Sequence, residues 1–125
     1  MKKNILVIDD VQDTRRLMRL ILERGGYKVV DAEDGIEGLR KAHSEPFDLI
    51  ITDIEMPGMD GYSLVKQLKS SGTTGEIPII VATSHGNLKE MFELGEKPSI
   101  ACLIEKPFMA EEILEKIDKL LKNSD

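Results

Sequence analysis

Carboxylate, hydroxyl and ammonium side chains follow four short apolar runs of this sequence. They are Asp9 and Asp10 after the first run, then Asp53, Thr83 and Lys106. Two carboxylates about 4 Å apart repel each other by about 4 kcal/mol at an effective dielectric constant of about 20. If the fold brings three of them together, the cluster must hold a proton or a cation. These residues are therefore candidates for a cation-dependent site.

The chemistry that suits this set of groups is phosphoryl transfer. Hard oxygen ligands with room for water favour Mg²⁺, which binds one or two protein carboxylates together with phosphate oxygens. Such a cation would neutralise the cluster and leave one carboxylate free to attack an electrophile. Phosphorus is the electrophile that these groups fit best. During the attack negative charge builds on its equatorial oxygens, and Mg²⁺, an ammonium and a hydroxyl donor can all stabilise that charge. An aspartate nucleophile would form an acyl phosphate, so the residues predict Mg²⁺-dependent phosphoryl capture on an aspartate.

Each motif also has an ordinary structural interpretation when it is taken alone. An Asp-Asp pair after a strand is typical of a helix N-cap or a solvated turn, and Lys106-Pro107 is typical of a loop. Asp53 could simply begin the turn Met56-Pro57-Gly58. The functional interpretation is favoured because all of these groups fall at the ends of alternating apolar runs.

The apolar runs themselves predict five strands, at Asn4–Asp9, Lys28–Ala32, Asp48–Thr52, Pro78–Thr83 and Ile100–Ile104. The first, third and fourth are continuously apolar, which is typical of parallel strands covered on both faces. Helical spacing of apolar residues follows each run, clearest at Ile113, Ile117, Leu120 and Leu121 and weakest at Leu88, Met91 and Leu94. The alternation predicts an α/β fold with helices on both faces of a five-stranded parallel sheet. In such sheets ligands bind beyond the carboxyl ends of the strands.

Length, composition and charge narrow the class of protein. The 125 residues fit a single domain spanning 1–125, and 41% hydrophobic residues exclude wholesale disorder. A net charge of −6 argues against a nucleic-acid binder, and a lone cysteine, Cys102, suits a reducing compartment. The longest aliphatic runs are far shorter than the roughly 20 residues of a membrane helix. We therefore expect a soluble, cytoplasmic protein with no membrane segment.

The motifs together resemble the receiver domain of bacterial two-component response regulators over essentially the whole chain. The residues that carry this resemblance are Asp9-Asp10, the run Asp53-Ile54-Glu55-Met56-Pro57-Gly58-Met59-Asp60-Gly61, Thr83, and Lys106-Pro107-Phe108. The resemblance implies a flavodoxin-like, doubly wound sheet with strand order 2-1-3-4-5. We expect no further domain after the fifth helix, which would make the chain most similar to single-domain, CheY-like members.

The resemblance also implies a role for each residue. Asp53 would be the phosphoacceptor, and Mg²⁺ would be bound by Asp10, Asp53 and the backbone carbonyl of Glu55, with Asp9 acting through water. Lys106 would pair with a phosphoryl oxygen, and Thr83 would turn inward to bind it. The Lys106–Pro107 peptide bond is expected to be cis. The partners would be a histidine kinase or histidine phosphotransfer protein, which donates the phosphoryl group, and a downstream protein target. The chain would be a self-catalysing phosphoacceptor rather than an enzyme.

The chain departs from the family pattern at Leu103, where the family has a switch aromatic. Altered signalling and a simple buried aliphatic are both open interpretations. Glu55 and His85 occupy the positions where the family tunes dephosphorylation, although solvent-facing loop side chains are the alternative. The first helix carries a basic face, which is either the family's docking surface for the donor or an ordinary solvated surface; its members are Arg15, Arg16, Arg19 and Arg24.

Three other functions compete with signalling by phosphorylation. The receiver chemistry could serve a phosphorelay or a phosphate sink. The chain could be an aspartate-nucleophile phosphohydrolase of the haloacid-dehalogenase type, but that family has Asp two residues after the nucleophile, where Glu55 stands. Finally, it could be an interaction domain that works without phosphorylation.

Overall fold

The computed structural model describes residues 2–84 and 100–122. Within them, five parallel strands form one sheet in the order β2-β1-β3-β4-β5. The strands are β1 (Asn4–Ile8), β2 (Lys28–Ala32), β3 (Leu49–Thr52), β4 (Ile79–Thr83) and β5 (Cys102–Glu105). The predicted strands and the predicted strand order are therefore confirmed, and no strand end differs from its prediction by more than two residues.

Both faces of the sheet are buried, as the continuous apolar runs predicted. On β1, Ile5 and Val7 pack into one hydrophobic cluster while Leu6 and Ile8 pack into the other. Successive strand residues point to opposite faces, so a strand covered on both sides needs apolar residues at every position. All four residues are at most 2% exposed.

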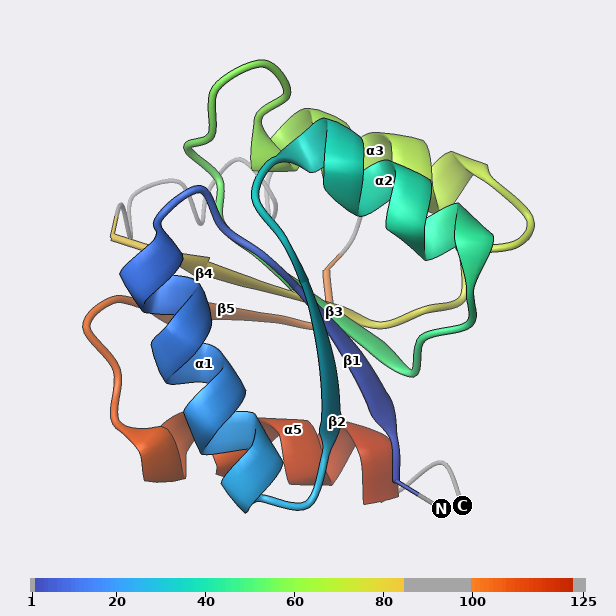
Figure 1. The fold of residues 1–125 in the computed structure, drawn as a ribbon. Helices are drawn as coiled ribbons and strands as arrows, with labels where there is room; N and C mark the ends of the chain where they lie inside the picture. The colour runs from blue at the N-terminus through green and yellow to red at the C-terminus, as the bar shows by residue number, and fades with distance from the viewer. Residues whose placement is uncertain (1, 85–99, 123–125) are drawn as a thin grey trace.

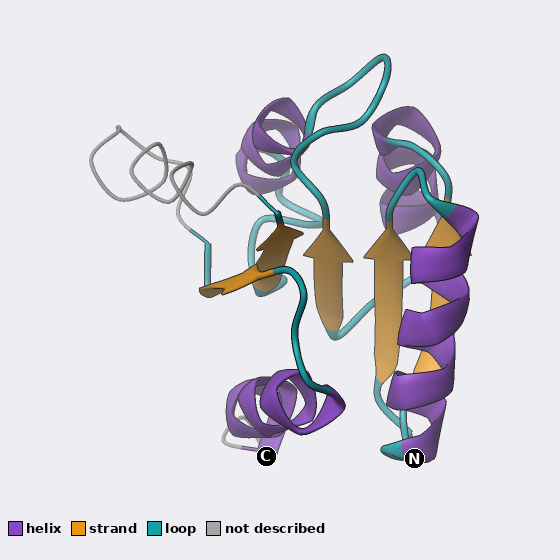
Figure 2. Cartoon of the chain, turned by 90° about the vertical axis from the view of Figure 1, so that its left-hand side faces the viewer, coloured by secondary structure: helices purple, strands orange, loops and turns teal. Residues whose placement is uncertain are grey.

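Four helices in the described ranges form the two outer layers (Figures 1 and 2). They are α1 (Gln12–Arg24), α2 (Gly35–Ser44), α3 (Gly61–Ser70) and α5 (Ala110–Lys122). In Figure 1, α1 and α5 cover one face of the sheet and α2 and α3 cover the other. The two hydrophobic clusters fill the space between the sheet and each helical layer. The helix predicted around Leu88, Met91 and Leu94 lies outside the described residues.

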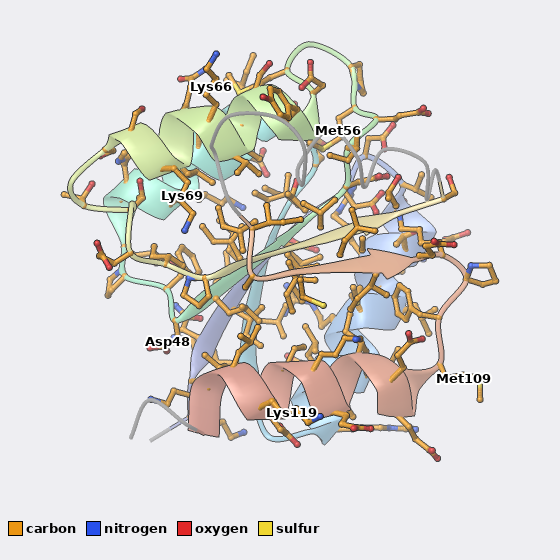
Figure 3. The ribbon with its side chains drawn as sticks, turned by 180° about the vertical axis from the view of Figure 1, so that it is seen from behind. Asp48, Met56, Lys66, Lys69, Met109 and Lys119 are labelled. Carbon is orange, nitrogen blue, oxygen red and sulfur yellow. The ribbon has the colours of Figure 1, made fainter. Side chains whose placement is uncertain are left out.

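The connection from α3 to β4 is held by Lys69. Figure 3 shows Lys66 projecting outward from α3, whereas Lys69 on the same helix points toward the sheet. The Lys69 ammonium donates hydrogen bonds to the carbonyls of Gly75 and Ile77, at 3.2 and 2.9 Å. Burial lowers its pKa, partly offset by the charge of Glu76. This contact fixes where β4 begins.

The outer edge of β2 is occupied by side chains from both neighbouring helices. Arg19 of α1 donates to the carbonyl of Val29 at 3.0 Å, and Lys41 of α2 donates to the carbonyl of Asp31 at 2.5 Å. These oxygens lie on the side of the edge strand that faces away from β1. Each helix layer is thereby tied to the same edge of the sheet.

None of the helices in the described ranges is long and apolar enough to cross a membrane.

Candidate functional site

Three carboxylates meet at the carboxyl ends of β1 and β3. Backbone hydrogen bonds extend the sheet one residue past each strand, from Asp9 N to the carbonyl of Ala32 at 3.2 Å and from Asp53 N to the carbonyl of Ile8 at 3.1 Å. As a result, carboxylate oxygens of Asp9, Asp10 and Asp53 all lie within 4.8 Å of one another. The strand ends therefore create the acidic cluster that the sequence predicted.

Lys106 brings a positive charge to this cluster from the far end of the chain. Its backbone N–H donates to the carbonyl of Thr83 at 2.7 Å, which continues the pairing of β4 with β5. Its ammonium lies 2.8 Å from Asp9 Oδ2 and 3.2 Å from Asp53 Oδ2. The Lys106–Pro107 peptide bond is cis, as expected.

Asp9 is held by the turn that leads into α1. Its Oδ1 accepts the backbone N–H of Val11 at 2.9 Å. The N-cap residue of α1 is Val11, which makes no side-chain capping hydrogen bond. The interpretation of Asp9 and Asp10 as a helix-capping pair is therefore wrong. Asp9 is 4% exposed, whereas Asp10 faces solvent.

Asp53 divides its two carboxylate oxygens between two partners. Oδ1 accepts the backbone N–H of Ile54 at 2.6 Å, and Oδ2 faces Lys106. Burial raises the pKa of the Asp53 carboxyl, and the charge of Lys106 and the N–H of Ile54 offset this only in part, with the charge of Asp9 raising it further. A cation bound at the cluster would favour the ionised, nucleophilic form.

The pKa of the Lys106 ammonium is also raised, through its two carboxylate neighbours. Burial by itself lowers the pKa of its ammonium, but the hydrogen bond and charge of Asp9, together with the charge of Asp53, outweigh burial and raise it. The side chain is thus a fixed cation beside two carboxylates. It suits an oxyanion that gains negative charge during a reaction.

The loop from β3 to α3 depends on a glycine that sequence reasoning did not single out as functional. A Cβ at Gly61 would lie 2.1 Å from the carbonyl oxygen of Asp53, and the Gly61 N–H donates to the carbonyl of Ile54 at 2.7 Å. Asp60 caps α3 by accepting the N–H of Ser63 at 2.7 Å. The motif Asp60-Gly61 therefore folds the helix start directly against the Asp53 backbone. A glycine at the start of a helix was the available signal.

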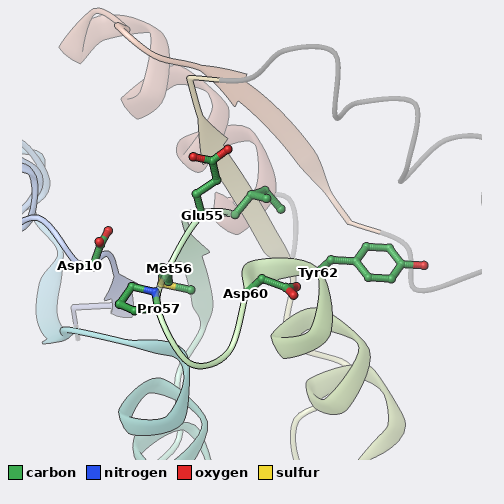
Figure 4. A pocket seen from close by; sticks show the side chains of 7 residues that line it. Asp10, Glu55, Met56, Pro57, Asp60 and Tyr62 are labelled. Atoms are coloured by element: carbon green, nitrogen blue, oxygen red, sulfur yellow. The ribbon is translucent and has the colours of Figure 1, made fainter.

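An open pocket adjoins the acidic cluster on the side of this loop (Figure 4). Its lining is Asp10, Ile54, Glu55, Met56, Pro57, Asp60 and Tyr62. Figure 4 shows the carboxylates of Asp10 and Glu55 apart from each other, both above Pro57 in this view. Asp10, the exposed member of the acidic cluster, is the residue that the cluster and the pocket share.

The remaining predicted residues fall at or near the same edge of the sheet. Thr83 ends β4 and is fully buried, and Glu55 is exposed in the loop after β3. Leu103 is half-buried on β5, where it packs against the cluster beneath α2 and α3. This packing favours the interpretation of Leu103 as a core aliphatic. His85 lies outside the described residues.

Comparison with known proteins finds relatives over nearly the whole chain. The chain is 37% identical over 123 residues to the transcriptional regulatory protein ResD of Bacillus subtilis, covering 96% of this chain and 48% of that protein. It is 29% identical to the chemotaxis protein CheY of Pseudomonas aeruginosa, covering 94% and 95%. The chain thus spans about half the length of ResD and nearly all of CheY.

Solved structures support the same relationship. The response regulator TrrA of Thermotoga maritima, solved in complex with Mg²⁺-BeF, superposes with a TM-score of 0.86 at 33% identity and covers 97% of this chain and 100% of that one. A family model described as the response regulator receiver domain matches residues 5–118. With its strand order and its acidic cluster at the ends of β1 and β3, the chain belongs to the response regulator receiver family.

Proposed function

We propose that this chain accepts a phosphoryl group on Asp53 in the presence of Mg²⁺ and signals by altered binding to a protein partner. The observation that carries the proposal is the meeting of Asp9, Asp10, Asp53 and Lys106 at one edge of the sheet, with carboxylate oxygens within 4.8 Å and an ammonium within 3.2 Å. The relative TrrA was solved with Mg²⁺-BeF, which supports the same assignment here.

The donor set fits Mg²⁺. Asp10 and Asp53 would bind the ion together with the backbone carbonyl of Glu55, and Asp9 would act through water. Oxygen ligands from few carboxylates, with one side open to solvent, match the preference of Mg²⁺ for water and phosphate oxygens. Bound there, the ion would supply charge neutralisation for the cluster and for the incoming phosphoryl oxygens.

The protein's own groups account for the rest of the reaction. A carboxylate oxygen of Asp53 attacks phosphorus and a new O–P bond forms. The N–P bond to the donor imidazole breaks, its electron pair stays on the ring nitrogen, and the imidazole leaves in its neutral form after taking a proton from solvent water. Ile54 N–H holds one carboxylate oxygen in place. Lys106 balances the charge that builds on the phosphoryl oxygens, and we assign to Thr83 the hydroxyl contact that marks the phosphorylated state.

The donor would be a histidine kinase or a histidine phosphotransfer protein in the cytoplasm, docked on α1. Three apolar side chains of this region are about half exposed, namely Val11 at 50%, Leu17 at 53% and Leu20 at 49%. Exposed apolar side chains in this region favour a docking surface over a purely solvated face. A donor docked on α1 would lie next to the acidic cluster, because α1 begins just after Asp9 and Asp10.

Intact-mass analysis after incubation with acetyl phosphate and Mg²⁺ tests the proposal. We expect one phosphoryl adduct in the wild type, none in Asp53→Asn, and an unchanged adduct in the control Asp13→Asn, which makes the same change at an exposed residue of α1. Rapid hydrolysis of many phosphomonoesters would instead support a phosphohydrolase. No adduct in the wild type would support an interaction domain that works without phosphorylation, and either result overturns the proposal.

A phosphorelay role is separated by a second measurement. The phosphorylated chain is mixed with a histidine phosphotransfer protein, and transfer is followed by the same mass analysis. Retention of the phosphoryl group on Asp53 together with tighter binding of a target supports signalling, whereas rapid onward transfer supports a relay.

A further inference from the structure

Arg15 of α1 touches the backbone of the acidic cluster. Its Nη1 donates to the carbonyl oxygen of Asp9 at 2.7 Å, and its Nε lies 3.7 Å from Asp31 Oδ2 on β2. The side chain is 14% exposed, although the sequence had placed it with Arg16 and Arg19 on a basic outer face. Arg15 therefore points inward, between the helix and the sheet edge.

The contact bears on the orientation of Asp10. The carbonyl of Asp9 belongs to the planar peptide that joins Asp9 to Asp10, so fixing this oxygen fixes the direction in which the chain enters Asp10. The other polar groups of Asp9 are also bound: its N–H donates to Ala32, Oδ1 accepts from Val11, and Oδ2 accepts from Lys106. Asp10 is exposed and depends on this backbone for its direction toward Asp53.

We infer that Arg15 is a positioning residue for the metal-binding carboxylates, acting through the Asp9–Asp10 peptide. The inference rests on the proposed Mg²⁺ site. Arginine suits the role because one nitrogen of its planar guanidinium donates to the carbonyl while another forms an ion pair with Asp31 at 3.7 Å, whereas lysine offers one nitrogen. Asp31 also balances the guanidinium charge, which limits the repulsion that Arg15 exerts on a cation.

Positioning and simple charge repulsion predict opposite changes in cation affinity when Arg15 is removed. Removal of a positive charge near a cation site strengthens cation binding if only charge matters. If Arg15 positions the carboxylates, its removal weakens binding, because partners that orient metal ligands typically contribute about 10–100-fold to metal affinity. Arg16 provides the matched control, since it is the next residue of the same helix, carries the same charge and is exposed.

The experiment titrates the purified chain with MgCl₂ alone by isothermal calorimetry. We expect Arg15→Ala to weaken Mg²⁺ binding by about tenfold, and Arg16→Ala to leave it unchanged or slightly stronger. Arg15→Lys keeps the charge, so a pure charge effect predicts wild-type affinity, while loss of positioning predicts weaker binding. If circular dichroism shows that Arg15→Ala is not folded, Arg15→Lys carries the test.

A second readout separates positioning from general damage to the site. The rate of adduct formation from acetyl phosphate is measured against Mg²⁺ concentration. We expect Arg15→Ala to need more Mg²⁺ for half-maximal rate and to approach the wild-type rate at saturation. Wild-type Mg²⁺ affinity in both Arg15 variants overturns the inference alone, whereas a wild type that binds no Mg²⁺ overturns the proposed function and the inference with it.

Discussion

The ammonium of Lys106 lies nearer to Asp9 Oδ2, at 2.8 Å, than to Asp53 Oδ2, at 3.2 Å. Asp9 is the more buried of the two carboxylates, with a side chain 5% exposed against 13% for Asp53. Lys106 is therefore anchored by a residue that we do not assign as the nucleophile. The same ammonium also reaches Asp53, through the longer hydrogen bond to Oδ2.

Replacement of Lys106 tests this relationship. Because the charge of Lys106 lowers the pKa of Asp53, we expect Lys106→Met to raise that pKa further in the absence of divalent ions. A carbon-detected NMR titration of the Asp53 carboxyl measures it. Lys119→Met is the control, since Lys119 is 72% exposed on α5. An Asp53 pKa equal to that of the wild type in both variants would show that Lys106 does not control the charge of Asp53.

Asp53 is expected to reduce the stability of the metal-free protein at neutral pH. Folding raises the pKa of Asp53, mainly through burial. Its contribution to stability is therefore fully present below the unfolded pKa of about 3.9 and is lost as the pH rises through the folded pKa. We expect metal-free Asp53→Asn to be more stable than the wild type at pH about 7, with the difference shrinking on acidification.

Thermal unfolding of both proteins over a range of pH checks this expectation. Added Mg²⁺ should stabilise the wild type and leave Asp53→Asn nearly unchanged, because a ligand that binds only the folded state raises its stability. A variant less stable than the wild type at neutral pH without metal would contradict the prediction.

Gly61→Ala should damage the site through the backbone. The new Cβ would fall 2.1 Å from the carbonyl oxygen of Asp53, so the loop must move or α3 must begin later. We expect a loss of about 3 kcal/mol in unfolding free energy, at the upper end of the usual range for overpacking, and slower formation of the adduct. Gly72→Ala is the control, since a Cβ there would meet nothing within 4 Å. Equal stability of the two variants in urea denaturation would refute the steric argument.

The contact between Tyr27 and Asp118 should make stability depend on alkaline pH. The Tyr27 hydroxyl donates to Asp118 Oδ1 on α5, and burial, followed by the hydrogen bond and charge of Asp118, raises the Tyr27 pKa above its ordinary value of about 10. The stability that the Tyr27–Asp118 contact contributes is thus present below pH about 10 and is lost as the pH rises through the pKa of Tyr27 in the folded protein.

We expect Tyr27→Phe to lose about 1–2 kcal/mol at neutral pH and to lose less stability than the wild type above pH about 10. Asp118→Asn retains an acceptor oxygen without the charge, so it should keep part of the neutral-pH stability. Urea denaturation at neutral and alkaline pH measures all three proteins. A constant difference between Tyr27→Phe and the wild type across this range would rule out the linkage.

The sequence predicted the parts of the fold that depend on pattern and on order along the chain. Continuous apolar runs such as β3 indicated burial on both faces, and alternation with helices indicated a parallel sheet. Because parallel strands end at the same edge, Asp9, Asp53 and Lys106 could be placed together from the sequence alone. The element ends were less precise, since one residue more or less at a strand end changes the hydrophobic pattern little.

The backbone contacts of Arg15 and Gly61 could not be derived from the sequence. Arg15 and Arg16 are neighbours of the same type, and only the rotation of α1 against β2 turns one inward to the Asp9 carbonyl. Gly61 has no side chain whose chemistry could suggest a role, and its importance lies in the space it leaves beside Asp53. Both depend on distances between segments that are far apart until the chain folds.

The side chains along β2 also bear on how copies of the protein meet in concentrated solution. An edge strand with bare carbonyls is a template for pairing with another molecule and for aggregation. Here Arg19 and Lys41 already occupy the outward carbonyls of Val29 and Asp31, and a second strand would have to displace two cations to add to the sheet. This edge is thereby protected against the intermolecular strand addition that leads to insoluble fibres.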